Sequence, residues 1–162
     1  MAYLIDANVL VEAFKGSYPL DIAEGFWRTL AAAASDGKIL SIDRVKAEVF
    51  KNEDALTQWC DDQLPDRFFG TSQGAFQQYR QIINWANQQF RLSPIALSKL
   101  AEADNADAWL VAEALRAGHC VVTLEVSAPM SRNNVKIPDI CSAHGVDCCS
   151  TMEMFRRLKL KF

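Results

Sequence analysis

The sequence lacks a hydrophobic run long enough to cross a membrane, since even the apolar stretch at residues 3–10 is interrupted by Asp6. The same carboxylate interrupts what would otherwise be a candidate signal-peptide core. Glycine and proline are scarce, with 7 and 5 among 162 residues, whereas half of the residues are hydrophobic. We therefore expect a single domain over residues 1–162 with one well-filled core, located in the cytoplasm and without membrane contact.

Disulfide patterns, zinc motifs and nucleotide-binding motifs are also missing. The five cysteines are an odd number, and none of them form a C-x-x-C spacing. This predicts reduced core cysteines in place of a secreted disulfide framework or a zinc site. Neither G-x-x-x-x-G-K-S/T nor G-x-G-x-x-G occurs, so no motif supports nucleotide-driven chemistry. The net charge of −3 argues against binding nucleic acid by charge alone. The basic C-terminal end is expected to be a solvated helix face, and it contains Arg156, Arg157, Lys159 and Lys161.

The stretch at residues 3–10 is the first one that suggests chemistry. Its apolar run and the helical spacing that follows predict a buried parallel strand that passes directly into a helix. Asp6 then lies at the carboxyl end of the strand, which is the edge of an open α/β sheet where ligands bind. An unpaired carboxylate is costly to bury, so Asp6 either caps the turn or binds something. Asn8 is positioned to be the N-cap of the helix, which favours binding for Asp6.

A second strand and helix follow the same order. Residues 38–42 are typical of a strand, and Asp43 is a natural N-cap for a helix that continues to Leu56. Glu48 lies on the apolar side of this helix. Its carboxylate therefore either reaches past the edge to solvent or is turned inward.

Three further helices are expected around these elements. Apolar spacing over residues 22–30 predicts a helix that ends at Gly37, and residues 64–70 predict a loop or a short extended piece. Residues 76–90 predict a helix with an aromatic stripe, including Phe76 and Phe90, turned inward. The Ser93-Pro94 pair predicts a capped helix start, and this helix is expected to break near Asp104-Asn105.

A helix over residues 106–117, ending at Gly118, places another acid in a first turn. Asp107 shares a helix face with the apolar Val111, and the helix dipole favours an ionised acid there. An ordinary first-turn acid needs no alignment with a buried stripe, so Asp107 is a stronger candidate than Asp104.

The strand expected at residues 120–125 ends in a carboxylate, Glu125, as the first strand does. The fold class is therefore α/β, with a three-layer α/β/α arrangement around a mostly parallel central sheet. Its strands would comprise residues 3–6, 38–42, 120–125 and 147–150. In this arrangement four acids converge at one end of the sheet: Asp6, Glu48, Asp107 and Glu125.

Electrostatics indicates what such a cluster binds. Two carboxylates about 4 Å apart repel by roughly 4 kcal/mol at an effective dielectric constant near 20, so four of them need a cation. Oxygen ligands suit Mg²⁺ or Mn²⁺. Zinc is not expected, because His119 precedes its strand and lies at the opposite edge, and His144 is not placed to join. A hard cation at an open acidic edge serves phosphodiester hydrolysis.

Four segments resemble the motifs of PIN domains, and the resemblance covers the whole chain. They are residues 4–8 (LIDAN), 45–49 (VKAEV), 106–112 (ADAWLVA) and 121–125 (VVTLE). In PIN nucleases the matching positions hold metal-binding acids. The resemblance therefore implies a PIN-like fold in which Mg²⁺ or Mn²⁺ is bound by the catalytic residues Asp6, Glu48, Asp107 and Glu125. Asn8 and Thr123 are implied in supporting roles, and Asp104 is a further supporting candidate.

Residues 135–141 (VKIPDIC) resemble a bacterial, VapC-like branch of this family that is carried as a domain of unknown function. For that branch the resemblance implies a metal-dependent endoribonuclease that acts as the toxin of a toxin-antitoxin pair. Its implied partners are the RNA substrate, a cognate antitoxin protein and a second copy in a homodimer. The sequence departs from the commonest PIN pattern in having Glu125 in place of Asp, and this longer side chain implies contact with the metal through water.

Two alternatives belong to other functional classes. A haloacid-dehalogenase-type phosphatase also begins with a strand-end Asp, but it needs a second Asp two residues later, where this sequence has Asn8. The other alternative is a non-catalytic PIN-like binding module that retains a metal or partner site, which Glu125 favours. A metal-dependent nuclease assay separates such a module from an enzyme.

Overall fold

A computed structural model describes all residues 1–162 and contains a five-stranded, all-parallel sheet flanked by nine helices. The strand order is β3-β2-β1-β4-β5. The strands are β1 (Tyr3–Ile5), β2 (Ile39–Ile42), β3 (Phe69–Gly70), β4 (Cys120–Val122) and β5 (Cys148–Cys149). The expected α/β class with a three-layer α/β/α arrangement is confirmed.

The central strands β1 and β4 determine where the functional residues lie. They pair in parallel with Ile5 opposite Val122, and all six of their residues are buried. Strands buried on both faces are typically continuous apolar runs, as both are here. Because the two strands end level with each other, the residues that follow them emerge at the same edge of the sheet.

The strands are shorter than the sequence indicates. β1 ends at Ile5 and β4 at Val122, so Asp6 and Glu125 lie in the connections that follow and not in the strands. The sheet pairing continues briefly, since the Asp6 N–H donates to Val122 O at 3.0 Å. The segment at residues 64–70, expected as a loop or short extended piece, contributes β3 at the sheet edge.

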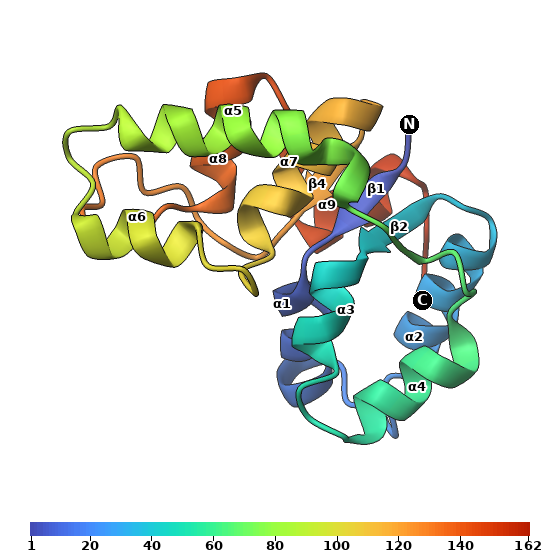
Figure 1. The fold of residues 1–162 in the computed structure, drawn as a ribbon. Coiled ribbons are helices and arrows are strands. Elements are labelled where there is room, and N and C mark those ends of the chain that lie inside the picture. Colours follow the sequence, from blue (N-terminus) through green and yellow to red (C-terminus); the bar gives the residue numbers. More distant parts are fainter.

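The helices alternate with these strands (Figure 1). They are α1 (Ala7–Glu12), α2 (Glu24–Ser35), α3 (Asp43–Val49), α4 (Ala55–Gln63), α5 (Phe76–Asn87), α6 (Pro94–Leu100), α7 (Asp107–Ala117), α8 (Ile137–His144) and α9 (Thr151–Arg157). A π-helical turn, η1 (Ala13–Ser17), extends α1, and a 3-10 turn, η2 (Gln73–Ala75), precedes α5. No helix is both long and apolar enough to cross a membrane.

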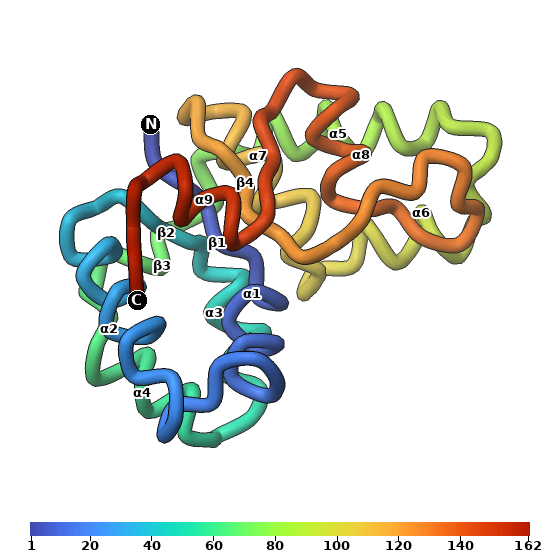
Figure 2. Tube along the Cα trace, turned by 180° about the vertical axis from the view of Figure 1, so that it is seen from behind, coloured from blue at the N-terminus to red at the C-terminus, as the bar shows by residue number.

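The helices form two groups on either side of the sheet. Figure 1 shows α1 to α4 together on one side and α5, α6 and α8 on the other, with α5 lying along α7. Seen from behind, the C-terminus lies beside α2, where Thr29 Oγ1 donates to Lys161 O at 3.1 Å (Figure 2).

Several local expectations are confirmed. Ser93 caps α6, its Oγ accepting from the Ala96 N–H at 3.1 Å, with Pro94 in the first turn. Gly118 ends α7 with φ +71°, a conformation that disfavours side chains. All five cysteines are free, and all are buried except Cys148, which is half-buried.

Other helix expectations are wrong at their ends. The helix expected from Asp43 to Leu56 is divided into α3 and α4, and Asp43 is its first residue and not its cap. The Asp43 carboxylate instead accepts from the backbone and hydroxyl of Ser72, at 3.2 and 2.6 Å, and so holds the segment after β3. A partner 29 residues away competes with the local helix end for this side chain.

The aromatic stripe of α5 is only partly inward. Phe76 and Phe90 are 53% and 106% exposed, in contrast to the expectation that both face the core. The helix ends at Asn87, so Phe90 lies outside it and does not continue the helical spacing. Phe76 is the first residue of the helix. The helix expected over residues 22–30 begins at Glu24, which leaves Ile22 exposed.

Candidate active site

Asp6 follows β1 directly and is only 4% exposed. It occupies the N-cap position of α1, but its side chain makes no capping hydrogen bond. The expectation that Asn8 is the N-cap is therefore wrong, because Asn8 lies inside the first turn. The carboxylate of Asp6 is free for another role.

Thr123 connects the two strand ends through a hydrogen-bond network. Its Oγ1 donates to Asp6 Oδ2 at 2.8 Å and accepts from Asn8 Nδ2 at 3.3 Å and from the Glu125 N–H at 3.1 Å. Asn8 Oδ1 accepts from the Leu124 N–H at 3.2 Å. Because the hydroxyl accepts two N–H groups, its single proton is directed to Asp6. Thr123 and Asn8 thus fix the Asp6 carboxylate from behind.

The acids expected from the sequence line one cleft of about 370 Å³ at this end of the sheet. Asp6 and Glu125 reach it from the strand ends, Glu48 from α3 and Asp107 from the start of α7. The complete lining is Asp6, Asn8, Glu48, Lys51, Lys99, Glu102, Asp104, Asn105, Ala106, Asp107 and Glu125. The predicted convergence of four carboxylates is therefore present, with Thr123 behind it.

Asp6 and Asp107 are strongly perturbed acids. Burial, followed by the charges of Glu125 and Glu48, raises the pKa of Asp6 to about 7, although the hydrogen bond from Thr123 opposes this shift. Burial and the charges of Asp6, Glu125 and Glu48 also raise the pKa of Asp107 to about 7. The two carboxylates therefore destabilise each other in the absence of a cation.

The backbone at Asp107 is held by a residue that sequence reasoning missed. Asn105 Oδ1 accepts from the Asp107 N–H at 2.9 Å, and Asn105 Nδ2 donates to Lys99 O at 2.9 Å. Asn105 thus joins the start of α7 to the end of α6. Its place two residues before the helix was the available signal, since Asn side chains often accept from backbone groups two residues on.

Glu48 and Asp104 lie at the open side of the cleft. Glu48 is exposed to solvent. Of the two alternatives that the sequence left open, its side chain therefore reaches solvent at the edge of the helix and is not turned into the core. Partial burial within the cleft, followed by the charges of Asp104 and Glu125, raises its pKa, while Lys51 opposes the shift. Asp104 is exposed and pairs with Lys51 at 3.7 Å. It is a rim residue, consistent with its lower rank beside Asp107.

Glu125 has a structural partner that the sequence did not indicate. Its Oε2 accepts from the backbone N–H of Ile137, the first residue of α8, at 2.7 Å. Asp6 and Glu125 lie at the same end of the sheet, as expected, but one oxygen of Glu125 is committed to α8. The longer side chain of Glu is what allows this contact across 12 residues of sequence.

The donor set fits a hard cation that keeps much of its water. No three His, Cys, Asp or Glu side chains are placed closely enough to enclose a metal ion by themselves. Mg²⁺ is commonly bound through one or two carboxylates, with water and substrate phosphate completing its octahedron. Asp6 and Asp107 match this pattern, because both are short, buried on one side, and mutually repulsive.

Neither histidine belongs to the cleft. His119 Nδ1 accepts from the Ala2 N–H at 3.0 Å, at the opposite end of β1, as expected. His144 packs edge-on against Trp85, with ring centroids 5.3 Å apart. The cleft therefore presents oxygen ligands together with lysines, and no imidazole.

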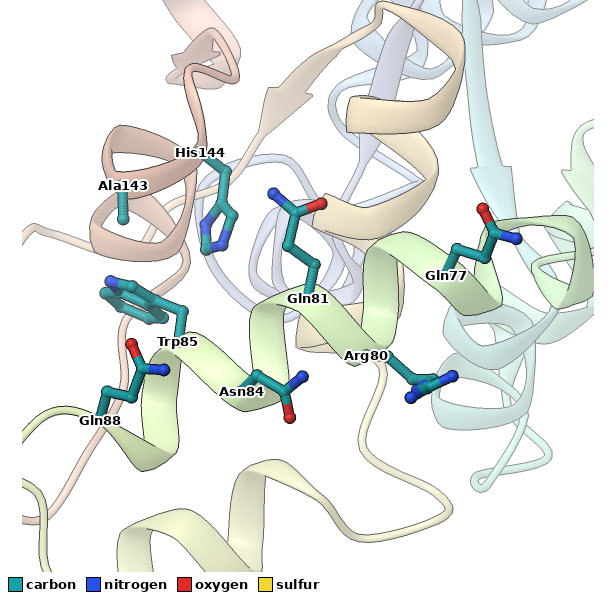
Figure 3. Close-up of a pocket in the computed structure, with 8 residues that line it drawn as sticks. All are labelled: Gln77, Arg80, Gln81, Asn84, Trp85, Gln88, Ala143 and His144. Atoms are coloured by element: carbon teal, nitrogen blue, oxygen red, sulfur yellow. The ribbon is translucent and has the colours of Figure 1, made fainter.

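Another hollow of about 630 Å³ lies between α5 and the end of α8, and Figure 3 shows its lining. Half of its lining residues carry carboxamides, and none carries a carboxylate: Gln77, Arg80, Gln81, Asn84, Trp85, Gln88, Ala143 and His144. None of the predicted site residues lines it. The acids predicted from the sequence line the cleft at the strand ends instead.

The fold and the cleft together define an α/β protein with an acidic site at the carboxyl ends of parallel strands. A family model described as "Domain of unknown function (DUF4411)" matches residues 3–162, so the chain belongs to the DUF4411 family. The comparisons with curated proteins and with solved structures each found no match.

Proposed function

We propose that this protein is a Mg²⁺- or Mn²⁺-dependent endoribonuclease that hydrolyses RNA phosphodiester bonds at the carboxylate cluster. The observation that carries the proposal is that Asp6 and Asp107 line the same cleft, where the charge of Asp6 contributes to the raised pKa of Asp107. Their pKa values are raised to about 7 by burial and by the surrounding acids. Such an arrangement is unfavourable for the bare protein and becomes favourable once a divalent cation is present.

The residues of the chain divide the work by position. Asp6 and Asp107 hold the cation, because their short side chains extend from a strand end and a first helical turn. Thr123 and Asn8 fix the orientation of Asp6. Glu48, at the solvent side of the cleft, is placed to accept a proton from an incoming water. When bound, the cation supplies charge neutralisation at the phosphate and lowers the pKa of the attacking water.

The resemblance to the VapC-like PIN branch supports the biological part of the proposal. On that basis the protein is the toxin of a toxin-antitoxin pair, acts in the cytoplasm on RNA, and is held inactive by a cognate antitoxin protein. Pairing into a homodimer belongs to the same proposal. The family match extends over residues 3–162, which include every segment that carries the resemblance.

A second candidate function is a non-catalytic module that binds a metal or a partner at the same cleft. The contact of Glu125 Oε2 with the Ile137 N–H favours it, because one of the four acids then serves the fold. Metal binding without cleavage is the behaviour that distinguishes this candidate from the enzyme.

The test combines metal binding and RNA cleavage on the same preparation. Protein freed of metal with EDTA is titrated with Mn²⁺ by calorimetry, and cleavage of a labelled single-stranded RNA is followed with and without Mn²⁺. We expect Asp107→Asn to weaken Mn²⁺ binding at least tenfold and to abolish cleavage, because the buried pair loses one charge. Asp21→Asn is the matched control, because Asp21 is an exposed acid in a turn and does not line the cleft.

The results separate the two candidates clearly. Mn²⁺ binding with Mn²⁺-dependent cleavage supports the enzyme, and Mn²⁺ binding without cleavage supports the binding module. Cleavage that persists in Asp107→Asn, or in EDTA, would exclude the proposed site.

A further inference from the structure

We propose that Lys99 and Lys136, together with the amides of Asn133 and Asn134, form a phosphate-binding subsite that holds the RNA strand beside the acid cluster. The inference deepens the proposed ribonuclease function and rests on it. It assigns the path of the substrate: the phosphate to be cleaved lies at the acids, and a neighbouring phosphate lies between the two lysines.

The first support is the continuity of two clefts. A smaller cleft of about 160 Å³ adjoins the acidic one and shares Lys99, Asn105, Asp107 and Glu125 with it. Its remaining lining comes from α6 and from the segment before α8: Ala96, Leu100, Asn133, Asn134, Val135 and Lys136. Apart from the two shared acids, this extension contains no carboxylate. The groove is therefore acidic at one end and basic at the other.

The second support is the charge pattern of the two walls. From Arg67 to Ala101 the sequence has no Asp or Glu but four basic residues, and from Val126 to Pro138 it has none but two basic residues. These segments carry +4 and +2 in a protein whose net charge is −3. Lys99 belongs to the first segment and Lys136 to the second, and these are the two of the six basic residues that line the groove. The absence of acids along both walls is what a polyanion requires.

The third support is that the two lysines are not neutralised within the protein. Lys51, on the acidic side, pairs with Asp104 at 3.7 Å, whereas neither Lys99 nor Lys136 takes part in a salt bridge. Lys136 and Asp107 line the same smaller cleft. Lysines without salt-bridge partners beside a cluster of acids suit a phosphodiester bound together with a divalent metal. The metal would then contact the acids, and the phosphate would contact the lysines.

The fourth support is the rigid attachment of the segment that carries Lys136. Its C-terminal end is held by Glu125 through the Ile137 N–H at 2.7 Å. Its start is held by Asp139, which accepts from the Ala128 N–H at 2.8 Å. Between these ends, Arg132 O accepts from the Ser93 N–H at 2.9 Å, which ties the segment to the start of α6. The two walls of the subsite are thus fastened to each other.

The amide residues complete the subsite without adding charge. Asn133 and Asn134 are exposed and line the groove, so their side chains can donate to phosphate or ribose oxygens. Asn105 differs from them, since both ends of its amide are already bonded to Asp107 N–H and Lys99 O. Asn105 therefore positions Lys99 and Asp107, and in the proposed subsite Asn133 and Asn134 contact the RNA.

The test measures RNA binding separately from cleavage. Asp6→Asn is the parent, chosen to silence cleavage, and binding of a labelled single-stranded RNA is followed by fluorescence anisotropy over a range of salt concentrations. Adding Lys99→Ala or Lys136→Ala should weaken binding about fivefold and lower the slope of log K against log salt by about 0.7, because one phosphate contact is lost. Lys136→Arg should restore both, and Lys15→Ala, on the exposed turn after α1, should change neither.

A second measurement separates a phosphate contact from an effect on the metal site. Removing Lys136 takes a positive charge away from Asp107, so Lys136→Ala in the otherwise unsubstituted protein should bind Mn²⁺ as tightly as before or more tightly. Weaker RNA binding together with undiminished Mn²⁺ binding supports the subsite. Weaker binding of both would overturn it.

The failure of this inference differs from failure of the proposed function. If both lysine variants match Lys15→Ala in affinity and salt slope while the unsubstituted protein cleaves RNA with Mn²⁺, the subsite is wrong and the nuclease remains. If the unsubstituted protein neither binds Mn²⁺ nor cleaves RNA, the function itself is wrong, whatever the lysines do.

Discussion

Asp6 and Asp107 combine short acidic side chains with backbones that adjoin buried elements of the core. Asp6 follows a strand whose three residues are all buried, and Asp107 opens a helix whose next seven residues are buried. Because the backbone of each residue is fixed by buried neighbours, the two carboxylates cannot move apart to reduce their repulsion. The consequence is that the pKa of each carboxyl group is raised to about 7, a perturbation typical of functional sites.

Replacing Asp6 with Asn should therefore stabilise the metal-free protein while abolishing metal-dependent cleavage. At pH 8 the ionised Asp6 is disfavoured in the fold, because its pKa is raised from 3.8 to about 7. This difference corresponds to at most about 4 kcal/mol, of which roughly 1–3 kcal/mol should be recovered. The melting temperature in EDTA measures this gain. A marked loss of stability in Asp6→Asn would instead identify Asp6 as a structural acceptor for Thr123.

At the scale of elements, α8 depends on a residue assigned to the site. The backbone N–H groups of a first helical turn lack partners within the helix, and Glu125 supplies an acceptor for the one at Ile137. The neighbouring Asp139 is 9% exposed and holds the loop that precedes its own helix. Two carboxylates thus hold the segment that forms the wall beside the cleft.

Substitutions of Glu125 should separate these two roles. Glu125→Gln keeps an oxygen for the Ile137 N–H, whereas Glu125→Asp shortens the side chain and loses that contact, at a cost of about 1 kcal/mol. Thermal unfolding should rank Glu125→Gln above Glu125→Asp in stability, and cleavage assays should rank them in the reverse order if the charge serves the metal. Equal stability of the two variants would mean that the contact with α8 contributes little.

Over the whole molecule, opposite charges are distributed to different parts of the groove. The acids follow the ends of β1 and β4 or lie in the last turn of α3 and at the start of α7, whereas α6 and the loop before α8 carry no acid. The overall charge of −3 conceals this separation. Net charge by itself is therefore a poor guide to whether this chain can bind a polyanion.

The stability of the metal-free protein should fall as the pH rises from about 4 to about 7. Asp6 and Asp107 have a reference pKa of 3.8 and a folded pKa of about 7, so in this window the native chain keeps protons that the unfolded chain has released. Their contribution to stability is complete below pH 4 and lost above pH 7.

The measurement is the difference between the unsubstituted protein and the double variant Asp6→Asn with Asp107→Asn, because other groups titrate in both. Unfolding by urea at several pH values in EDTA should show the extra decline only in the unsubstituted protein. Saturating Mn²⁺ should remove the decline, and an identical pH profile for both proteins would contradict the raised pKa values.

Local pattern was sufficient for much of the fold and of the site. The apolar runs at β1 and β4, the helical spacing of α7 and the capping pair at α6 depend on residues next to one another in sequence. Because strands buried on both faces must be apolar, a carboxylate directly after such a run marks the sheet edge. Asp6 and Glu125 were found in this way and Asp107 from the helical spacing of α7, and the structure brings the three together in one cleft.

What the sequence could not predict depends on partners far apart along the chain. The division of the helix after Asp43, the exposed position of Glu48 and the link from Glu125 to Ile137 are set by contacts that form only when the layers pack. Lys99 and Lys136 also come to line the same groove only through tertiary packing. A side chain with several possible hydrogen-bond partners takes the one that tertiary packing brings within reach, and no local pattern contains that choice.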